Sequence, residues 1–118
     1  MKKLLLLLIV LLAPLTSMGA LLNVDTDYQV TEVKLDDRTF GIALVGDNPD
    51  VTQNDVYFGD DSKCFREVHL RNGTLKEYRV SVDKFIKLIS KGSRVHVRGG
   101  RDWDGSIHAY TVRLKTYE

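Results

Sequence analysis

The sequence predicts a mainly β domain with one short helix. Segments rich in β-branched and aromatic residues recur along the chain and alternate apolar with polar side chains, as strands do. Asn72-Gly73 and Asp104-Gly105 each separate two such segments, and both dipeptides suit hairpin turns because they tolerate a positive φ. One short stretch, residues 83–91, instead places its apolar residues at helical spacing. We therefore expect a single small β domain that carries one helix.

The N-terminal residues have the three parts of a secretion signal. Lys2 and Lys3 precede an unbroken apolar run, and small residues follow around Gly19. Pro14 ends the run far short of the about 20 apolar residues that a membrane-spanning helix needs. We therefore expect residues 1–19 to be a signal peptide and residues 20–118 to be one domain without a membrane span. The protein is then expected to be periplasmic or secreted.

Charge is distributed unevenly along the expected domain. Residues 21–62 carry ten acidic and two basic side chains, whereas residues 63–118 carry thirteen basic and six acidic ones. One interpretation is that the two halves neutralise each other in the folded domain. The other is that one face of the domain is basic and receives an anionic ligand.

The first half of the domain is expected to form a hairpin, or one sharply bent long strand, followed by a long loop. Residues 28–35 and 39–45 have strand composition, and residues 21–27 are a lead-in to the first strand. Residues 46–61 are expected to be an acidic loop that contains a short apolar island at residues 56–58.

The second half is expected to form a hairpin, a helix and a further hairpin. Residues 64–71 and 74–82 flank the first of the two turns. Asp83 is the expected N-cap of the helix, and Gly92 its left-handed stop. The side of this helix that is expected to be buried consists of Phe85, Ile86, Leu88 and Ile89.

The last hairpin pairs residues 93–99 with residues 106–115, and its alternation separates two faces. The expected core face consists of Val95, Val97, Tyr110, Val112 and Leu114. The expected outer face consists of Arg94, His96, Arg98 and Arg113, beside Ala109 and Thr111.

The end of the chain resembles a known family. Lys91-Gly92-Ser93-Arg94-Val95-His96-Val97-Arg98-Gly99 follows the helix, Arg101-Asp102-Trp103 lies at the turn, and Ile107-His108-Ala109 opens the closing strand. This arrangement is similar to the end of an OB-fold and, more narrowly, resembles the bacterial OB-fold family of small periplasmic proteins. The resemblance implies a small OB-like β-barrel that binds a ligand, with a short amphipathic helix between the third and fourth barrel strands. An SH3-like barrel or an open α+β sheet would suit the same strand count.

A candidate binding site lies on the outer face of the last hairpin. Guanidinium groups pair with phosphate or carboxylate, and an exposed indole can stack on a base or a sugar ring. The alternative is a solvated sheet face whose indole packs against its own hairpin. The candidate residues are Arg94, His96, Arg98 and Arg113, with Arg101 and Trp103 at the loop tip.

The spacing of the aspartates, histidines and cysteine along the sequence favours neither a metal site nor a catalytic site. The loop aspartates could offer oxygen ligands to Ca²⁺, but EF-hand spacing is absent and solvated charge is the favoured interpretation. The three histidines fall on separate predicted strands, and no nucleophile motif accompanies the single cysteine, Cys64, which we expect to be buried. We expect no metal, no cofactor and no enzyme activity. The loop aspartates are Asp47, Asp50, Asp55, Asp60 and Asp61, and the histidines are His69, His96 and His108.

These observations predict a monomeric periplasmic binding module without catalytic activity. Its expected ligand is an anionic glycan, peptidoglycan or an envelope protein. Nucleic acid is the usual ligand of OB-folds, but the domain is not basic overall. Two alternatives stay open. One is an interaction subunit of an envelope assembly that docks through residues 56–58 or a sheet edge, and the other is a small hydrolase or nuclease.

Overall fold

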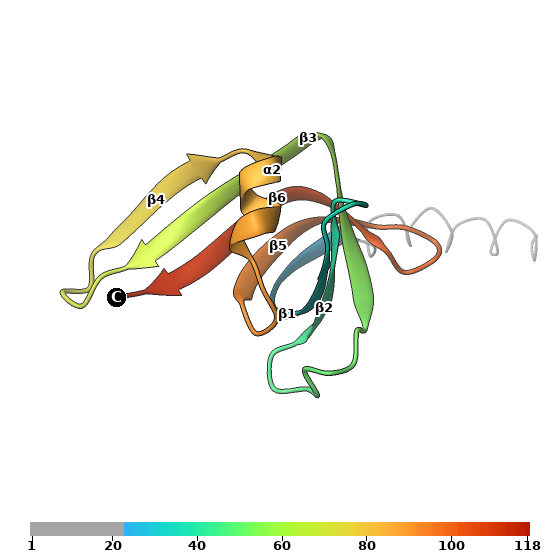
Figure 1. Cartoon of the computed structure of the whole chain (residues 1–118), viewed down its shortest axis with the longest axis horizontal. Coiled ribbons are helices and arrows are strands. Elements are labelled where there is room, and N and C mark those ends of the chain that lie inside the picture. The colour runs from blue at the N-terminus through green and yellow to red at the C-terminus, as the bar shows by residue number, and fades with distance from the viewer. Residues whose placement is uncertain (1–22) are drawn as a thin grey trace, which may run out of the picture.

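Strands dominate the structure, a computed structural model that describes residues 23–118. The predicted signal peptide lies outside these described residues. Within them, no helix is both long enough and apolar enough to cross a membrane. In chain order the elements are β1 (Asn23–Lys34), β2 (Thr39–Leu44), β3 (Asn54–His69), β4 (Leu75–Val80), α2 (Val82–Leu88), β5 (Arg94–Arg101) and β6 (Ile107–Tyr117) (Figure 1).

Five of the described strands close a barrel. β1 pairs antiparallel with β2 and with β5, and β2 pairs antiparallel with the first part of β3. β6 pairs antiparallel with β5 and parallel with β3, which completes the ring (Figure 1). Because β4 pairs only with β3 and lies outside the ring, α2 connects the third and fourth barrel strands. The prediction of a mainly β, OB-like barrel with one short helix is confirmed.

Aromatic side chains fill the end of the barrel that α2 covers. Phe85 of α2 is fully buried, and its ring centroid lies 6.0 Å from that of Phe58 and 6.5 Å from that of Phe40. Ile86 is also buried, whereas Leu88, expected on the same side, is 44% exposed. Burial of each large apolar side chain contributes about 1.5–3 kcal/mol, so packing rather than its own length stabilises this short helix.

Both ends of α2 differ from the prediction. The Ser81 hydroxyl accepts a hydrogen bond from the backbone N–H of Lys84, so Ser81 is the N-cap and Asp83 lies in the first turn. A carboxylate there is still favourable because the N-terminus of a helix carries partial positive charge. The helix ends at Leu88, and Gly92, with a φ of 94°, lies in the turn that leads into β5.

Two segments expected to be irregular belong to strands. β1 begins at Asn23, and its first residues pair with β5, so residues 23–27 of the expected lead-in belong to a strand. β3 begins at Asn54, which shortens the expected loop over residues 46–61. Val56 is fully buried opposite Phe40, and Phe58 packs against the core. Val56 and Phe58 therefore face inward, whereas Tyr57 between them points to the outer face and stacks on His108, so the three residues do not form one exposed apolar patch.

A β-bulge changes the faces of the last hairpin. Arg98 pairs with Thr111, but Gly99 pairs with Ala109, so Tyr110 is an extra residue in β6. A one-residue slip exchanges the faces of a strand. Ala109, expected outside, is accordingly fully buried, and Tyr110, expected in the core, is 45% exposed. A Cβ at Gly99 would lie 2.1 Å from the carbonyl oxygen of His108, so the close approach of the two backbones requires glycine.

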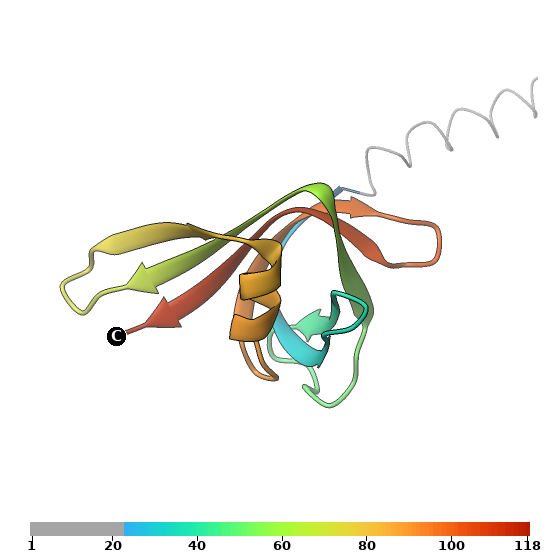
Figure 2. The ribbon, with the colours of Figure 1, turned by 45° about the horizontal axis from the view of Figure 1, so that its top comes forward.

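The hairpin at Asn72-Gly73 is confirmed and extends past the barrel. Gly73 has a φ of 84° in the turn between β3 and β4. Figure 2 shows these two strands and the end of β6 running out beyond α2. Cys64, in β3, is buried as expected, and its burial raises the pKa of the thiol to about 12.

Candidate functional site

The predicted cationic side chains of β5 and β6 share one outer face. Arg94, His96 and Arg98 alternate with buried valines along β5, and His96 lies opposite Arg113 of β6. Side chains at directly opposite positions point to the same face of a sheet. The structure therefore brings four of the six candidate residues together, and β1 and β3 extend the same face on either side.

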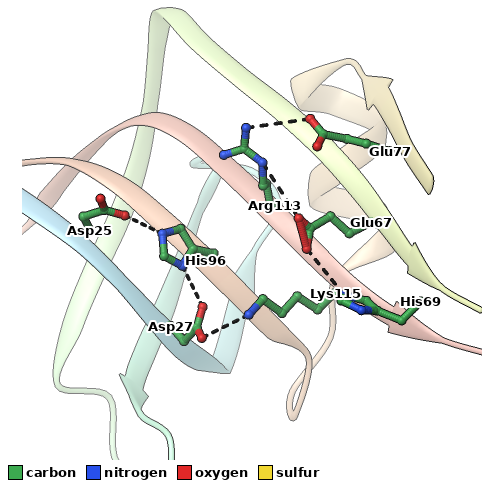
Figure 3. A network of polar contacts seen from close by, with 8 residues as sticks. All are labelled: Asp25, Asp27, Glu67, His69, Glu77, His96, Arg113 and Lys115. Atoms are coloured by element: carbon green, nitrogen blue, oxygen red, sulfur yellow. Dashed lines mark hydrogen bonds and ion pairs between the residues drawn. The ribbon is translucent and has the colours of Figure 1, made fainter. Parts of the chain in front are cut away.

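His96 lies between two carboxylates of β1. Its Nδ1 is 2.7 Å from Asp27 Oδ1, and its Nε2 is 2.5 Å from Asp25 Oδ1 (Figure 3). Lys115 of β6 also contacts Asp27, with its Nζ 3.0 Å from Oδ2. Both ring nitrogens can donate at once only when the imidazole is protonated, so this arrangement favours the charged ring.

His96 and Asp27 both have shifted pKa values. Burial opposes protonation of the His96 ring, but its hydrogen bonds with Asp27 and Asp25 outweigh burial and raise the pKa of His96 above its ordinary 6.5. Hydrogen bonds from His96 and Lys115 lower the pKa of Asp27 below 3.8. His96 and Asp27 therefore stabilise each other's charged forms, and His96 has little free charge to offer to a ligand.

Arg113 is held by two carboxylates and an aromatic ring. Its Nε lies 3.9 Å from Glu67 Oε2 and its Nη2 lies 3.7 Å from Glu77 Oε1, as Figure 3 shows. The guanidinium carbon also lies 4.9 Å from the centre of the Phe65 ring. The middle of the outer face is thus a network of mutually compensated charges rather than a basic stripe.

Arg98 lies beyond His96 along β5, where cations have fewer carboxylate partners than His96 and Arg113 have. It is exposed, and within residues 23–118 no carboxylate lies close enough to form an ion pair with it. Arg98 lines a cavity of about 320 Å³ together with Tyr110, Asn23 and Asp25. Asp25 is already engaged by His96, so its negative charge at the rim is partly offset. The cavity combines a guanidinium group, an aromatic ring and an amide.

An aromatic row continues from this cavity and is formed by two strands, β6 and β3. The Tyr57 and His108 rings are stacked with centroids 5.2 Å apart, and the His108 and Tyr110 rings meet edge to face at 5.3 Å. Strand glycines make room for these rings, because a Cβ at Gly59 would lie 2.6 Å from His108 Nε2 and one at Gly100 would lie 3.2 Å from the Tyr110 hydroxyl. The row is therefore built into the sheet.

The loop between β5 and β6 is anchored next to this row. The Tyr57 hydroxyl donates a hydrogen bond to Asp102 Oδ2 at 2.5 Å, and this contact raises the pKa of Tyr57 to about 12. Asn54 donates from its side-chain amide to the Gly105 carbonyl oxygen at 2.8 Å. Trp103, at the tip, is 80% exposed and does not pack against its own hairpin. An anchored loop with an exposed indole is a geometry suited to stacking on a flat ligand.

Arg101 is separated from the other candidate residues. It pairs with Ile107, whose side chain is fully buried, so Arg101 lies on the opposite side of the hairpin from Arg98. The sequence prediction did not include Tyr57, His108 or Tyr110 in the site. The strand glycines were the available signal, since glycine inside a strand often marks a bulge or a close approach.

The other two histidines and the loop aspartates Asp50 and Asp61 have partners within the fold. His108 Nε2 lies 2.9 Å from Asp61, and His69 stacks on Tyr117 with ring centroids 4.8 Å apart. Asp50 forms an ion pair with Lys91. Across the described residues 23–118, no three His, Cys, Asp or Glu side chains converge in a way that could hold a metal ion.

Comparison with known proteins adds no relative. No protein-family model matches the chain, and neither the curated proteins nor the solved structures contain a significant match.

Proposed function

We propose that this protein is a non-enzymatic binding module of the bacterial envelope whose ligand is an acidic glycan. Its binding site is the cavity lined by Arg98 and Tyr110, extended by the aromatic row and by the Trp103 loop. The supporting observation is that an exposed arginine without an ion pair lines the same cavity as a half-exposed tyrosine. Carboxylated sugars need both features, because the guanidinium pairs with the carboxylate while the aromatic ring covers the apolar face of the sugar.

The position of the cavity agrees with the way OB-like barrels bind ligands. Their contact surface commonly includes the loop between the last two barrel strands, which here carries Trp103. A glycan is favoured over nucleic acid because the outer face presents Asp25, Asp27, Glu67 and Glu77 among its cations. A surface that tracks many phosphates needs a net positive charge, whereas one sugar carboxylate needs a single arginine.

Titration calorimetry with a matched pair of trisaccharides tests this proposal. The acidic probe is trigalacturonic acid and the neutral one is galactotriose. We expect the acidic probe to bind and Arg98→Ala to weaken its binding by roughly tenfold or more, as loss of one charged hydrogen-bonding group implies. Arg94→Ala is the matched control because Arg94 is an exposed arginine of the same strand and face but does not line the cavity.

The proposal predicts a specific ranking of ligands and variants. Tyr110→Ala should weaken both probes, whereas Arg98→Ala should weaken only the acidic one. Equal losses for Arg94→Ala and Arg98→Ala would show general charge attraction and contradict a built site. Tighter binding of a single-stranded oligonucleotide than of the acidic glycan would favour nucleic acid instead.

A further inference from the structure

β4 has a free edge. It is the last strand of the sheet, pairs only with β3, and has five exposed residues out of its six (Figure 1). Tyr78 and Leu75 are each about half exposed on it. An edge strand presents a row of backbone N–H and C=O groups that can pair with another strand. Natural edge strands are usually short, covered or interrupted, and β4 is uncovered among the described residues.

The register of the hairpin shows which backbone groups point outward. Leu70 donates its N–H to the Thr74 carbonyl at 2.9 Å, so this pair directs its backbone groups inward, between β3 and β4. Hydrogen-bonded and non-hydrogen-bonded pairs alternate along an antiparallel ladder. Lys76 and Tyr78 therefore also bond to β3, whereas the backbone groups of Glu77 and Arg79 point to the free edge.

Charge then selects one way for two copies of β4 to pair. A two-fold antiparallel pairing must join outward-pointing residues, which leaves four central registers. Centring the axis on Lys76 places two ammonium groups opposite each other. Centring the axis on Glu77 places two carboxylates opposite each other, and centring it on Arg79 places two guanidinium groups opposite each other. Centring it on Tyr78 instead places Glu77 opposite Arg79 twice and stacks two tyrosines. Opposite charges across strands stabilise a sheet, and like charges destabilise it.

We propose that the protein forms a two-fold dimer in which β4 pairs antiparallel with β4 of a second copy, with Tyr78 on the axis. Arg79 supports this assignment, because no carboxylate pairs with it within residues 23–118 and it faces the Phe65 position of β3. In the dimer it gains Glu77 of the partner copy, and the outer sheet face becomes continuous across both molecules. The dimer replaces the monomer expected from the sequence and does not depend on the proposed glycan site.

Charge exchange tests the dimer. The mass of the purified protein is measured by sedimentation across a range of concentrations, for the parent chain and for Glu77→Arg, Arg79→Glu and the double variant. We expect each single variant to raise the dissociation constant roughly tenfold or more, because two attractive pairs become repulsive. The double variant restores the pairs and should restore the dimer. Lys76→Glu should change the dissociation constant little, because Lys76 lies opposite the apolar Val80 of the second copy in this register.

Recovery of the dimer in the double variant separates an effect on association from an effect on folding. Glu77 also contacts Arg113 within its own molecule, and both Glu77→Arg and the double variant lose that contact. Loss of the contact therefore cannot explain a dimer that returns only in the double variant. Circular dichroism confirms that every variant is folded. A parent protein that stays monomeric at millimolar concentration, or a double variant as weak as the singles, overturns the proposal.

Disulfide trapping tests the axis independently. A non-hydrogen-bonded antiparallel pair has a Cα–Cα distance of about 4.5 Å, within the range of a disulfide. Tyr78→Cys should therefore form covalent dimers on mild oxidation. Glu77→Cys should not, because its copies would lie diagonally at about 7–8 Å. Cys64 is buried and does not compete. Efficient trapping of Glu77→Cys and not of Tyr78→Cys would overturn the assigned register.

Discussion

The outer sheet face has two parts that look alike in sequence and differ in structure. Around His96 and Arg113, each cation is met by two carboxylates from other strands of the sheet. Around Arg98 and Tyr110, only two residues after His96 in β5, a guanidinium and an aromatic ring line an open cavity. β5 contributes to both parts, with His96 in the first and Arg98 in the second. The difference lies in how the acidic side chains are engaged, because Asp25 of β1 lines the cavity but is hydrogen-bonded to His96 and forms no ion pair with Arg98.

This difference shows why a row of basic residues is poor evidence for a basic surface. Most surface ion pairs contribute little to stability, but they determine which charges are still free to bind a ligand. His96 uses both ring nitrogens in hydrogen bonds within the fold and Arg113 forms ion pairs there, whereas Arg98 does neither. Binding should therefore depend on Arg98, and stability on His96 and Arg113.

Gly99→Val should have the largest effect, because Gly99 lies at the bulge that joins the two parts. A Cβ there would lie 2.1 Å from the carbonyl oxygen of His108, a backbone atom that cannot rotate away. We expect a loss of roughly 3 kcal/mol in the free energy of unfolding, at the upper end of overpacking costs. Urea unfolding followed by circular dichroism measures it. Gly100→Ala is the control, since its Cβ would meet only the mobile end of Tyr110 at 3.2 Å, and a similar loss there would contradict this explanation.

Arg113→Ala should have the next largest effect on stability. Its removal leaves Glu67, whose side chain is only 12% exposed, without the guanidinium beside it, and it uncovers the Phe65 ring. For a partly buried pair of this kind we expect a loss of about 1.5 kcal/mol. Arg98→Ala should cost almost nothing in the same unfolding measurement. The two parts of the face would not be distinct if both variants lost equal stability.

His96→Gln should cost about 1 kcal/mol near pH 5.5, and the cost should depend on pH. The pKa of His96 is raised above 6.5 in the folded protein, so its stabilising contribution is fully present below that pH and is lost as pH rises through the folded value. The lowered pKa of Asp27 acts oppositely: its contribution is present above 3.8 and is lost as pH falls through the folded value. The charged groups that face the His96 ring are Asp25, Asp27, Arg113 and Lys115.

Unfolding of the parent protein and of His96→Gln at several pH values measures the pH range over which the charged His96 ring stabilises the fold. The difference in free energy of unfolding should be greatest between about pH 4 and pH 6.5 and should shrink above it. A difference that grows above neutral pH would show that the neutral ring, not the imidazolium, stabilises the cluster.

The sequence predicted the barrel because its evidence was local. The turn at Asn72-Gly73 and the alternation of Val95 and Val97 depend on neighbouring residues, and both are confirmed. The position of Tyr110 was wrong because a bulge depends on how closely two strands approach, which alternation within one strand does not report. The acidic residues around the apolar island predict a loop, but Val56 pairs with β2 and is buried, so this prediction is wrong.

The candidate site was predicted only in part for a similar reason. Strand alternation places Arg94, His96 and Arg98 on one face, but it cannot show that Asp25 and Asp27 lie beside His96, since about 70 residues separate them along the chain. Likewise, Tyr57 meets His108 through the parallel pairing of β3 and β6, which forms only when the barrel closes. Contacts between distant strands thus decide which cations and which rings are free.

Trp103→Ala should have the smallest effect on stability and a clear one on binding. The indole is 80% exposed, so its removal should change the free energy of unfolding by less than about 0.5 kcal/mol. If the loop tip contacts the ligand, the same variant should weaken both trisaccharides, because stacking does not depend on the sugar's charge. Calorimetry and urea unfolding on one preparation separate the two effects. A variant that loses stability but keeps its affinity would place Trp103 in the fold and confine the site to Arg98 and Tyr110.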